Sequence, residues 1–87
     1  MKMNKEKFLK TEFGAEMDQT VKALDQALTE KPADRNTINE LFARLDVYKQ
    51  GVRTFYGINL YFTRTSKYFG MCTEDESYYL IKVERKN

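Results

Sequence analysis

The chain has 87 residues, of which 41% are hydrophobic, 14% are aromatic and 32% are charged. This length fits one domain with one core, and this aromatic content is too high for a disordered chain. Fifteen basic and thirteen acidic residues give a net charge of +2. That charge is weak for a dedicated nucleic-acid binder and has the wrong sign for an acidic mimic of DNA. The sequence has no histidine, so the commonest general base and metal ligand are both missing.

The cysteine content and the N-terminal segment favour a reducing compartment. The single cysteine, Cys72, excludes an internal disulfide, whereas small secreted domains usually need several. The basic residues within 1–8 are not followed by an apolar segment, so we expect no signal peptide. No apolar run reaches the roughly 18–20 residues of a membrane span. We therefore expect a cytoplasmic protein that has no membrane partner.

The first predicted element is a helix over residues 5–30. Its apolar residues recur at intervals of three or four and form one stripe: Leu9, Phe13, Met17, Val21, Leu24 and Leu28. Asn4 is a candidate N-cap for the whole helix, and Thr11 is a candidate for a shorter one. Gly14 lies inside the pattern, so the sequence leaves open whether the helix is broken near it. Pro32 ends the helix because proline disfavours the α conformation in the residue before it.

The second predicted helix covers residues 37–50. Thr37 and Glu40 have the spacing of a capping box, in which each side chain bonds to the backbone N–H of the other residue. The apolar stripe of this helix comprises Ile38, Leu41, Phe42, Leu45 and Tyr48. Gly51 suits the left-handed residue just past a helix end. Because the connection over 32–36 is short, the two helices should form an antiparallel hairpin.

After Gly51 the apolar residues alternate, which predicts three strands: residues 53–63, 67–73 and 78–84. We pair Phe62 with Phe69 across the first turn. Across the second turn we pair Met71 with Tyr79. These pairings place one almost wholly apolar face toward the helices. The sequence therefore predicts an α+β fold with the helical hairpin packed on one face of a three-stranded antiparallel meander.

The same pairings place a second set of aromatic residues on the opposite face of the sheet. This candidate interaction face comprises Phe55, Tyr61, Tyr68, Tyr78 and Leu80, with Arg53, Arg64 and Lys82 beside them. Two layers suffice for a small domain, so we expect this face to be open. One interpretation is that the tyrosines simply pack across strands. The other is a protein interface, because tyrosine provides contact area and a hydrogen bond at low entropic cost.

No residue pattern in the sequence predicts catalysis. Cys72 is followed by Glu74, Asp75 and Glu76, and nearby acids raise rather than lower the pKa of a thiol. The same three acids lack the spacing of a calcium-binding loop. No phosphate-binding loop, dinucleotide fingerprint or hydrolase motif occurs. We therefore expect no enzyme activity, no cofactor and no bound metal.

The leading hypothesis is a non-catalytic module that binds another protein, or a second copy of itself, through the tyrosine-rich face. In size and lack of catalytic groups the chain resembles small accessory proteins of bacteriophages and mobile elements, including inhibitors of host defence systems. This resemblance is one of class, and it implies an inhibitor or adaptor in the host cytoplasm. The alternative is sequence-tolerant binding of RNA or single-stranded DNA, with the same rings as stacking platforms. A structural subunit of a larger assembly also fits the sequence.

Overall fold

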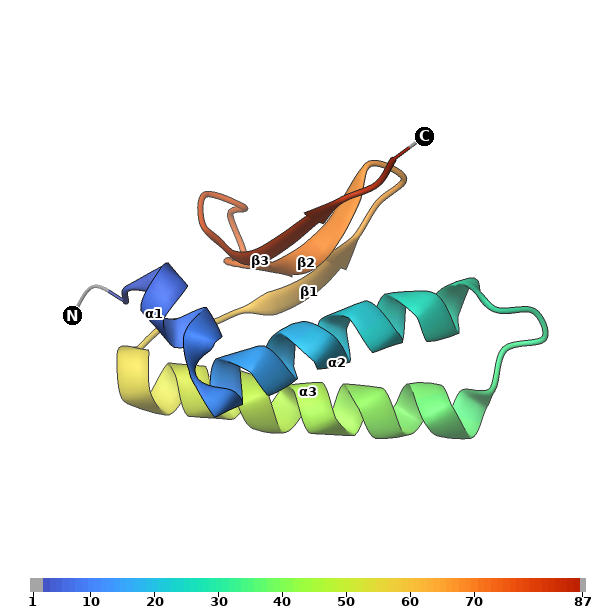
Figure 1. Cartoon of the computed structure of the whole chain (residues 1–87), viewed down its shortest axis with the longest axis horizontal. Coiled ribbons are helices and arrows are strands. Elements are labelled where there is room, and N and C mark those ends of the chain that lie inside the picture. Colours follow the sequence, from blue (N-terminus) through green and yellow to red (C-terminus); the bar gives the residue numbers. More distant parts are fainter. Residues whose placement is uncertain (1–2, 87) are drawn as a thin grey trace.

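The computed structural model describes residues 3–86, in which three helices precede three strands. In chain order the elements are α1 (Lys5–Lys10), α2 (Glu12–Thr29), α3 (Arg35–Tyr56), β1 (Tyr61–Arg64), β2 (Tyr68–Cys72) and β3 (Tyr79–Glu84) (Figure 1). The predicted α+β fold is confirmed, because α2 and α3 form a hairpin and an antiparallel meander of order β1-β2-β3 lies against it. Residues 1, 2 and 87 lie outside the described residues. The prediction of a single domain over 1–87 includes these three residues, and the expectation of no signal peptide includes residues 1 and 2.

The N-terminal helical region consists of two helices, and Thr11 separates them. The extended backbone of Thr11 (φ −73°, ψ 158°) ends α1, and its side-chain oxygen accepts from the N–H of Gly14 to cap α2 (3.1 Å). The Thr11 hydroxyl also donates to the carbonyl of Phe8 (2.6 Å). A Cβ on Gly14 would collide with that carbonyl, so glycine permits the tight approach of the two helices. The helix predicted over 5–30 is therefore broken near Gly14, the alternative that the sequence left open, and both candidate caps are in use: Asn4 caps α1 and Thr11 caps α2.

The third helix begins earlier than the sequence predicts. Asp34 is its N-cap, and the carboxylate accepts from the N–H groups of Asn36 and Thr37 (3.1 and 3.3 Å). The Thr37 hydroxyl donates to the same carboxylate (2.9 Å), and these bonds lower the pKa of Asp34. The capping box at Thr37 and Glu40 is therefore wrong, because an ionised carboxylate three residues earlier occupies the N-terminus of the helix.

The third helix also continues past its predicted end at residue 50. Gly51 lies inside α3 against the ring of Phe13, where a Cβ would come within 2.6 Å of Cζ. Gly57, with φ at 68°, is the left-handed residue that ends the helix. Residues 53–56, which were predicted to begin the first strand, are therefore helical, and β1 begins eight residues later than predicted.

The pairing of β1 with β2 differs from the prediction by two residues. Phe62 pairs with Met71, and Phe69 pairs with Arg64. Because side chains alternate with a period of two, this shift leaves every side chain on its predicted face. Phe62, Phe69 and Met71 accordingly belong to the core or pack against it.

The pairing of β2 with β3 contains a β-bulge that the alternating pattern does not reveal. Met71 pairs with Ile81 and the next residue, Cys72, pairs with Tyr79, so Leu80 is the extra residue. One extra residue exchanges the two faces on the N-terminal side of the bulge. The predicted pairing of Met71 with Tyr79 is wrong, because Met71 pairs two residues further along β3, and the bulge places Tyr79 on the outer face of the sheet.

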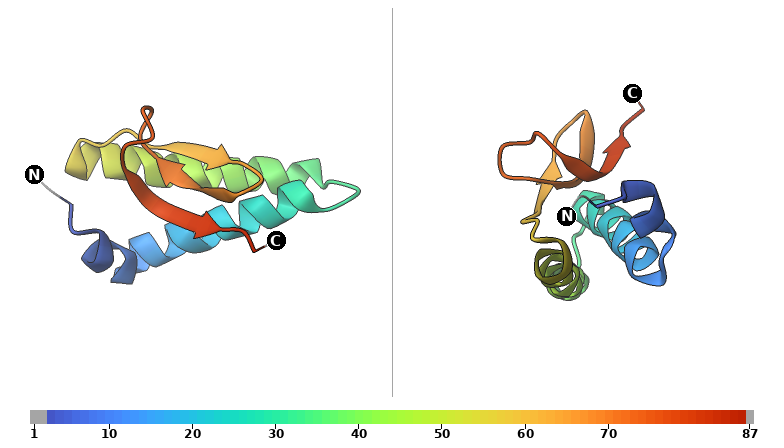
Figure 2. Two further views of the ribbon diagram at one scale, coloured as in Figure 1. Left: turned by 90° about the horizontal axis from the view of Figure 1, so that it is seen from above. Right: turned by 90° about the vertical axis from the view of Figure 1, so that its left-hand side faces the viewer.

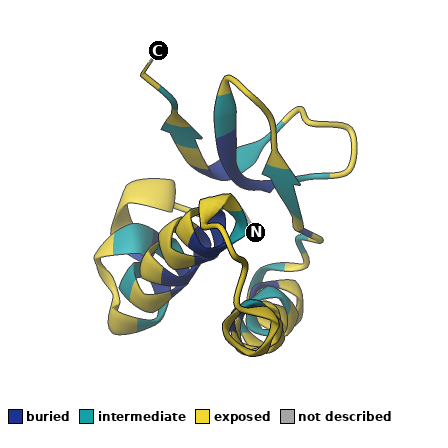
Figure 3. Cartoon of the chain, turned by 90° about the vertical axis from the view of Figure 1, so that its right-hand side faces the viewer, coloured by how far each residue is buried: buried dark blue, intermediate teal, exposed yellow. Residues whose placement is uncertain are grey.

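Seen from above, β1 and β2 lie over α3 and the end of β3 lies over α2 (Figure 2), while the closest packing between sheet and helices is that of β2 against α2. In α2 seven of 18 residues are buried, whereas in α3 three of 22 are buried. The fully buried side chains at the centre of the core come from α2, α3, the residue before β1, and strands β2 and β3: Met17, Val21, Leu24, Leu45, Val52, Leu60, Met71 and Leu80. Most of α3 therefore stays accessible to solvent (Figure 3).

Candidate functional site

The structure brings together three of the eight residues predicted for the interaction face. Tyr61, Tyr68 and Lys82 lie on the outer face of the sheet. Leu80 is fully buried, and Tyr78 is half-buried against the core. The β-bulge is the physical reason, because it turns Leu80 and Tyr78 inward and brings Tyr79 to the outer face in their place.

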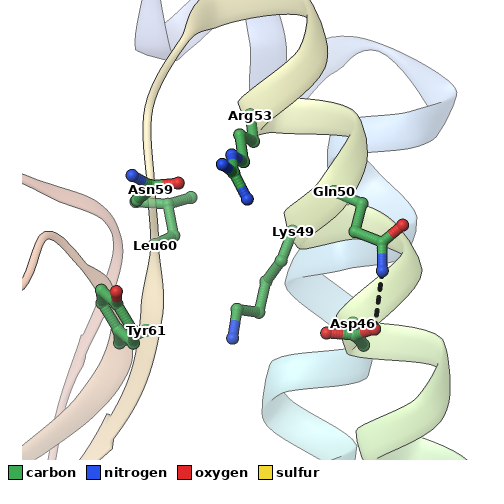
Figure 4. Close-up of a pocket in the computed structure, with 7 residues that line it drawn as sticks. All are labelled: Asp46, Lys49, Gln50, Arg53, Asn59, Leu60 and Tyr61. Carbon is green, nitrogen blue, oxygen red and sulfur yellow. Dashed lines mark hydrogen bonds between the residues drawn. The ribbon is translucent and has the colours of Figure 1, made fainter.

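Two other predicted residues, Arg53 and Phe55, lie on α3 rather than on a strand. Arg53 points toward the chain segment that leads into β1 (Figure 4). Phe55 is 74% exposed and borders an apolar hollow with Phe8 and Phe13, away from the sheet. Their placement on the sheet face was wrong because the helix continues to Tyr56.

Arg64 does not lie at the rim of the outer face but in an ion cluster beneath the sheet. Its Nε donates to Asp25 Oδ1 and its Nη2 to Thr29 Oγ1, both at 2.8 Å. Arg85 donates to the same Asp25 carboxylate, and its Nε donates to the carbonyl of Thr65 (2.8 Å). Asp25 is 8% exposed. This cluster, which we name the Asp25 cluster, fastens α2 to β1 and to the segment after β3, and its role is structural.

The sequence contained a signal for the Asp25 cluster that the sequence analysis missed. Asp25 falls inside the apolar stripe of the first helix, between Leu24 and Leu28 and four residues after Val21. An acid within such a stripe is buried and therefore needs a cationic partner or hydrogen-bond donors. The pattern identifies Asp25 as buried, but it does not say which basic residues reach it.

On the outer face, Tyr68 and Tyr79 engage each other. Their rings meet edge to face, with centroids 5.6 Å apart at 86°. The Tyr79 hydroxyl donates to the Tyr68 oxygen (3.1 Å), which raises the pKa of Tyr79 above its ordinary value. The Lys82 ammonium lies 4.8 and 4.9 Å from the two ring centroids. These two half-buried tyrosines therefore fit the interpretation of cross-strand packing.

Tyr61 differs, because it is 46% exposed and lies on the edge strand β1 beside α3. Between this strand and α3 is an open pocket of about 230 Å³ (Figure 4). Seven residues line it: Asp46, Lys49, Gln50, Arg53, Asn59, Leu60 and Tyr61. The helix α3 contributes four of them, the segment before β1 contributes Asn59 and Leu60, and Tyr61 is the first residue of β1, so the pocket lies at the start of β1.

The charged side chains of this pocket differ in their hydrogen bonds and ion pairs. The Lys49 ammonium lies 5.3 Å from the centroid of the Tyr61 ring, and the Arg53 side chain extends into the pocket (Figure 4). Within residues 3–86, neither cation forms an ion pair. The one acid, Asp46, accepts from the Gln50 amide at 3.0 Å. The pocket therefore presents two unneutralised cations to a binding partner.

An exposed aromatic ring lies beyond the pocket on the same side of α3. Phe42 is 43% exposed and meets Phe62 of β1 edge to face, with centroids 6.0 Å apart at 88°. Phe42 lies seven residues before Lys49, which is two helical turns and therefore the same side of α3. We name the pocket together with Phe42 the α3–β1 groove; it combines two exposed rings, Phe42 and Tyr61, with two free cations.

Two other kinds of site, a nucleophilic cysteine and a metal site, can be compared with the described residues. Cys72 is buried, and its burial, with a contribution from the charge of Glu76, raises the pKa of the thiol. A thiol that holds its proton is a poor nucleophile. Over residues 3–86 no group of three or more cysteine, aspartate or glutamate side chains is arranged to hold a metal ion.

Comparison of the chain with protein-family models, with curated proteins and with solved structures finds no match. In the described part of the chain, no helix is both long enough and apolar enough to cross a membrane. The α3–β1 groove is therefore the feature from which a function can be argued.

Proposed function

We propose that the protein is a non-catalytic module, an inhibitor or adaptor, that binds another protein through the α3–β1 groove. The observation that supports this function is the pair of exposed rings, Phe42 at 43% and Tyr61 at 46%, on either side of an open groove. Aromatic and arginine side chains are enriched at the centres of protein interfaces and supply most of their binding energy. Arg53 and Tyr61 are such residues, and both line this groove.

The proposed surface is narrower than the tyrosine-rich face that the sequence predicts. Tyr68 and Tyr79 already contact each other and Lys82, so a partner gains less by covering them. Tyr61 has one contact of this kind, to the flexible Lys49 side chain. We therefore assign the centre of the interface to Tyr61.

Binding of RNA or single-stranded DNA is the second candidate, because Lys49 and Arg53 flank an exposed Tyr61 ring. Such a ring can stack on a base while the cations hold phosphates. However, Glu74 and Asp75 border the adjoining hollow next to Asn59 and Tyr61, where they would repel a phosphate chain leaving the groove. A nucleic acid carries a phosphate at every nucleotide, whereas a protein partner can confine its acidic residues to the positions that face Lys49 and Arg53, so we favour a protein partner.

Affinity capture with matched variants tests the proposed function. Wild-type protein, Tyr61→Ser and Val47→Ser serve as baits in nuclease-treated lysate of the source organism, and captured proteins are identified by mass spectrometry. Val47 is a suitable control because it is 63% exposed on the same helix but outside the groove. We expect Tyr61→Ser to weaken the affinity for the purified partner about 30-fold, as for an interface hot spot. The Val47→Ser change should alter it less than threefold.

Two results would contradict this proposal. Equal binding by Tyr61→Ser and wild type would exclude the groove as the contact surface. Capture that disappears after nuclease treatment, and that falls steeply with salt, would instead support the nucleic-acid function.

A further inference from the structure

The three-stranded sheet is too narrow to cover both long helices. Packed helices lie about 8–10 Å apart and neighbouring strands about 4.8 Å apart. Three strands therefore span about 10 Å, which covers one helix and the near side of the next. Here the closest packing between sheet and helices is that of β2 against α2, and α3 keeps 19 of its 22 residues at least partly accessible. The edge strand β1 lies on the α3 side of the molecule (Figure 3), so a fourth strand beside β1 would widen the sheet on that side.

The two edges of the sheet are not equally able to accept another strand. The order β1-β2-β3 makes β1 and β3 the edge strands. A bulge at Leu80 interrupts the pairing of β3 with β2. Bulges protect an edge from added strands. The pairing of β1 is regular, so β1 is the edge that remains open.

The backbone of β1 has hydrogen-bonding groups that point away from the sheet. The N–H of Thr65, next to the strand, donates to the carbonyl of Tyr68 at 2.8 Å. Along an antiparallel pair, bonded and non-bonded positions alternate. The N–H and C=O groups of Phe62 and Arg64 therefore point to the free edge, where an extended chain can bond to them.

The cations of α3 determine the charge of the strand that fits. Lys49 and Arg53 are one helical turn apart, about 6 Å, which is close to the roughly 6.8 Å between alternate side chains of a strand. Two acidic residues on one face of an added strand can therefore reach both cations. The β1 strand of a second copy fits less well, since it would bring a second Lys49 and Arg53 against the first pair.

We infer that the partner docks by strand addition, with an extended acidic segment pairing with β1 and lying over α3. This inference rests on the proposed function and specifies the chemistry of the partner. On binding, the Lys49 ammonium exchanges the Tyr61 ring for a carboxylate. The backbone supplies register and affinity, and the Lys49 and Arg53 side chains select acidic segments.

A peptide of nine residues alternating glutamate and valine is the probe. It is titrated to millimolar concentration at low salt, and amide hydrogen exchange is followed by NMR. We expect exchange at Phe62 and Arg64 to slow at least tenfold, with no such change at Lys82 on β3. The same peptide with lysine in place of glutamate should bind at least tenfold more weakly. A version N-methylated at alternate residues, which lacks the bonding N–H groups but keeps the charge, should also fail.

Charge-reversed variants complete the test. Lys49→Glu with Arg53→Glu should lose the glutamate peptide and bind the lysine peptide instead. Arg35→Glu with Arg44→Glu, an equal charge change on α3 outside the groove, should bind like the wild type. Circular dichroism verifies that both double variants are folded.

Other outcomes would overturn the inference. Unchanged exchange at Phe62 and Arg64, or equal binding of the N-methylated peptide, would exclude strand addition. Protection of these amides in a dimer without peptide would assign the edge to a second copy. If Tyr61→Ser weakens partner binding while these amides stay unprotected in the complex, the proposed function stands and strand addition is wrong.

Discussion

Two pairs of cations in this protein occupy contrasting surroundings. Arg64 and Arg85 converge on Asp25 beneath the sheet, where they bond to its carboxylate. Lys49 and Arg53 face the α3–β1 groove, where they form no ion pair within residues 3–86. The first pair fastens the sheet to α2, and the second leaves charge available to a partner. The difference shows that the function of a basic residue here depends on which side of the sheet it reaches.

The strongest test of this contrast removes the acid from the Asp25 cluster. Asp25→Ala leaves two partly buried guanidinium groups without their counter-charge, since the side chains of Arg64 and Arg85 are 36% and 24% exposed. Because water screens them in part, we expect a loss of about 2 kcal/mol in the free energy of unfolding. This corresponds to a Tm lower by roughly 8–16 °C.

Thermal and urea unfolding measure this effect, with Asp46→Ala as the control. Asp46 is an exposed acid of the groove, so its removal should change stability by less than about 0.5 kcal/mol. Equal stability of Asp25→Ala and Asp46→Ala would mean that the cluster does not hold the sheet on α2.

The second test exchanges the cations themselves for methionine. Arg64→Met removes the bonds to Asp25 and Thr29, so we expect a loss of about 1–2 kcal/mol in the free energy of unfolding. Lys49→Met loses one exposed cation–π contact and should cost less than about 0.5 kcal/mol. The same variants should rank in the opposite order when affinity for an acidic peptide is measured. A Lys49→Met variant that is as destabilised as Arg64→Met would assign the groove a structural role.

The third test concerns acids that are stabilised by hydrogen bonds rather than by cations. The Thr73 hydroxyl and the N–H and hydroxyl of Ser77 lower the pKa of Asp75 to about 2. Because the folded pKa lies below the unfolded value, the ionised carboxylate stabilises the fold above about pH 4. This contribution is lost as the pH falls from 4 toward 2. Asp34 at the start of α3, whose pKa is also lowered, acts in the same direction.

Urea midpoints measured between pH 5 and pH 2 test this small effect. Asp75→Asn should have a shallower decline over this range than the wild type, because asparagine does not titrate. Glu74→Gln is the matched control, since Glu74 lies in the same turn without such bonds to Thr73 or Ser77. An unchanged decline in Asp75→Asn would show that the carboxylate is not stabilised in the fold.

Local signals in the sequence placed most of the elements. The apolar stripe from Met17 to Leu28 identified α2, and alternation identified β2 and β3. Errors arose where two local signals competed. Thr37 and Asp34 both qualify as helix caps, and Gly51 and Gly57 both qualify as helix ends. At the N-terminal end the Asp34 carboxylate bonds to the N–H groups of Asn36 and Thr37, and at the C-terminal end Val52 and Tyr56 pack into or against the core, so the helix extends to the outer residue in both cases.

By itself, the sequence determined that helices precede strands, the apolar stripe of α2 and the inner faces of β1 and β2, and the absence of histidine chemistry. These are properties of residue spacing and composition, so they need no knowledge of distant contacts. The tertiary structure decided the rest. The bulge at Leu80 exchanged Tyr78 for Tyr79 on the outer face, and Asp25 found its cations 39 and 60 residues away. The groove exists because three strands cannot cover two helices, and that depends on how layers pack rather than on any local pattern.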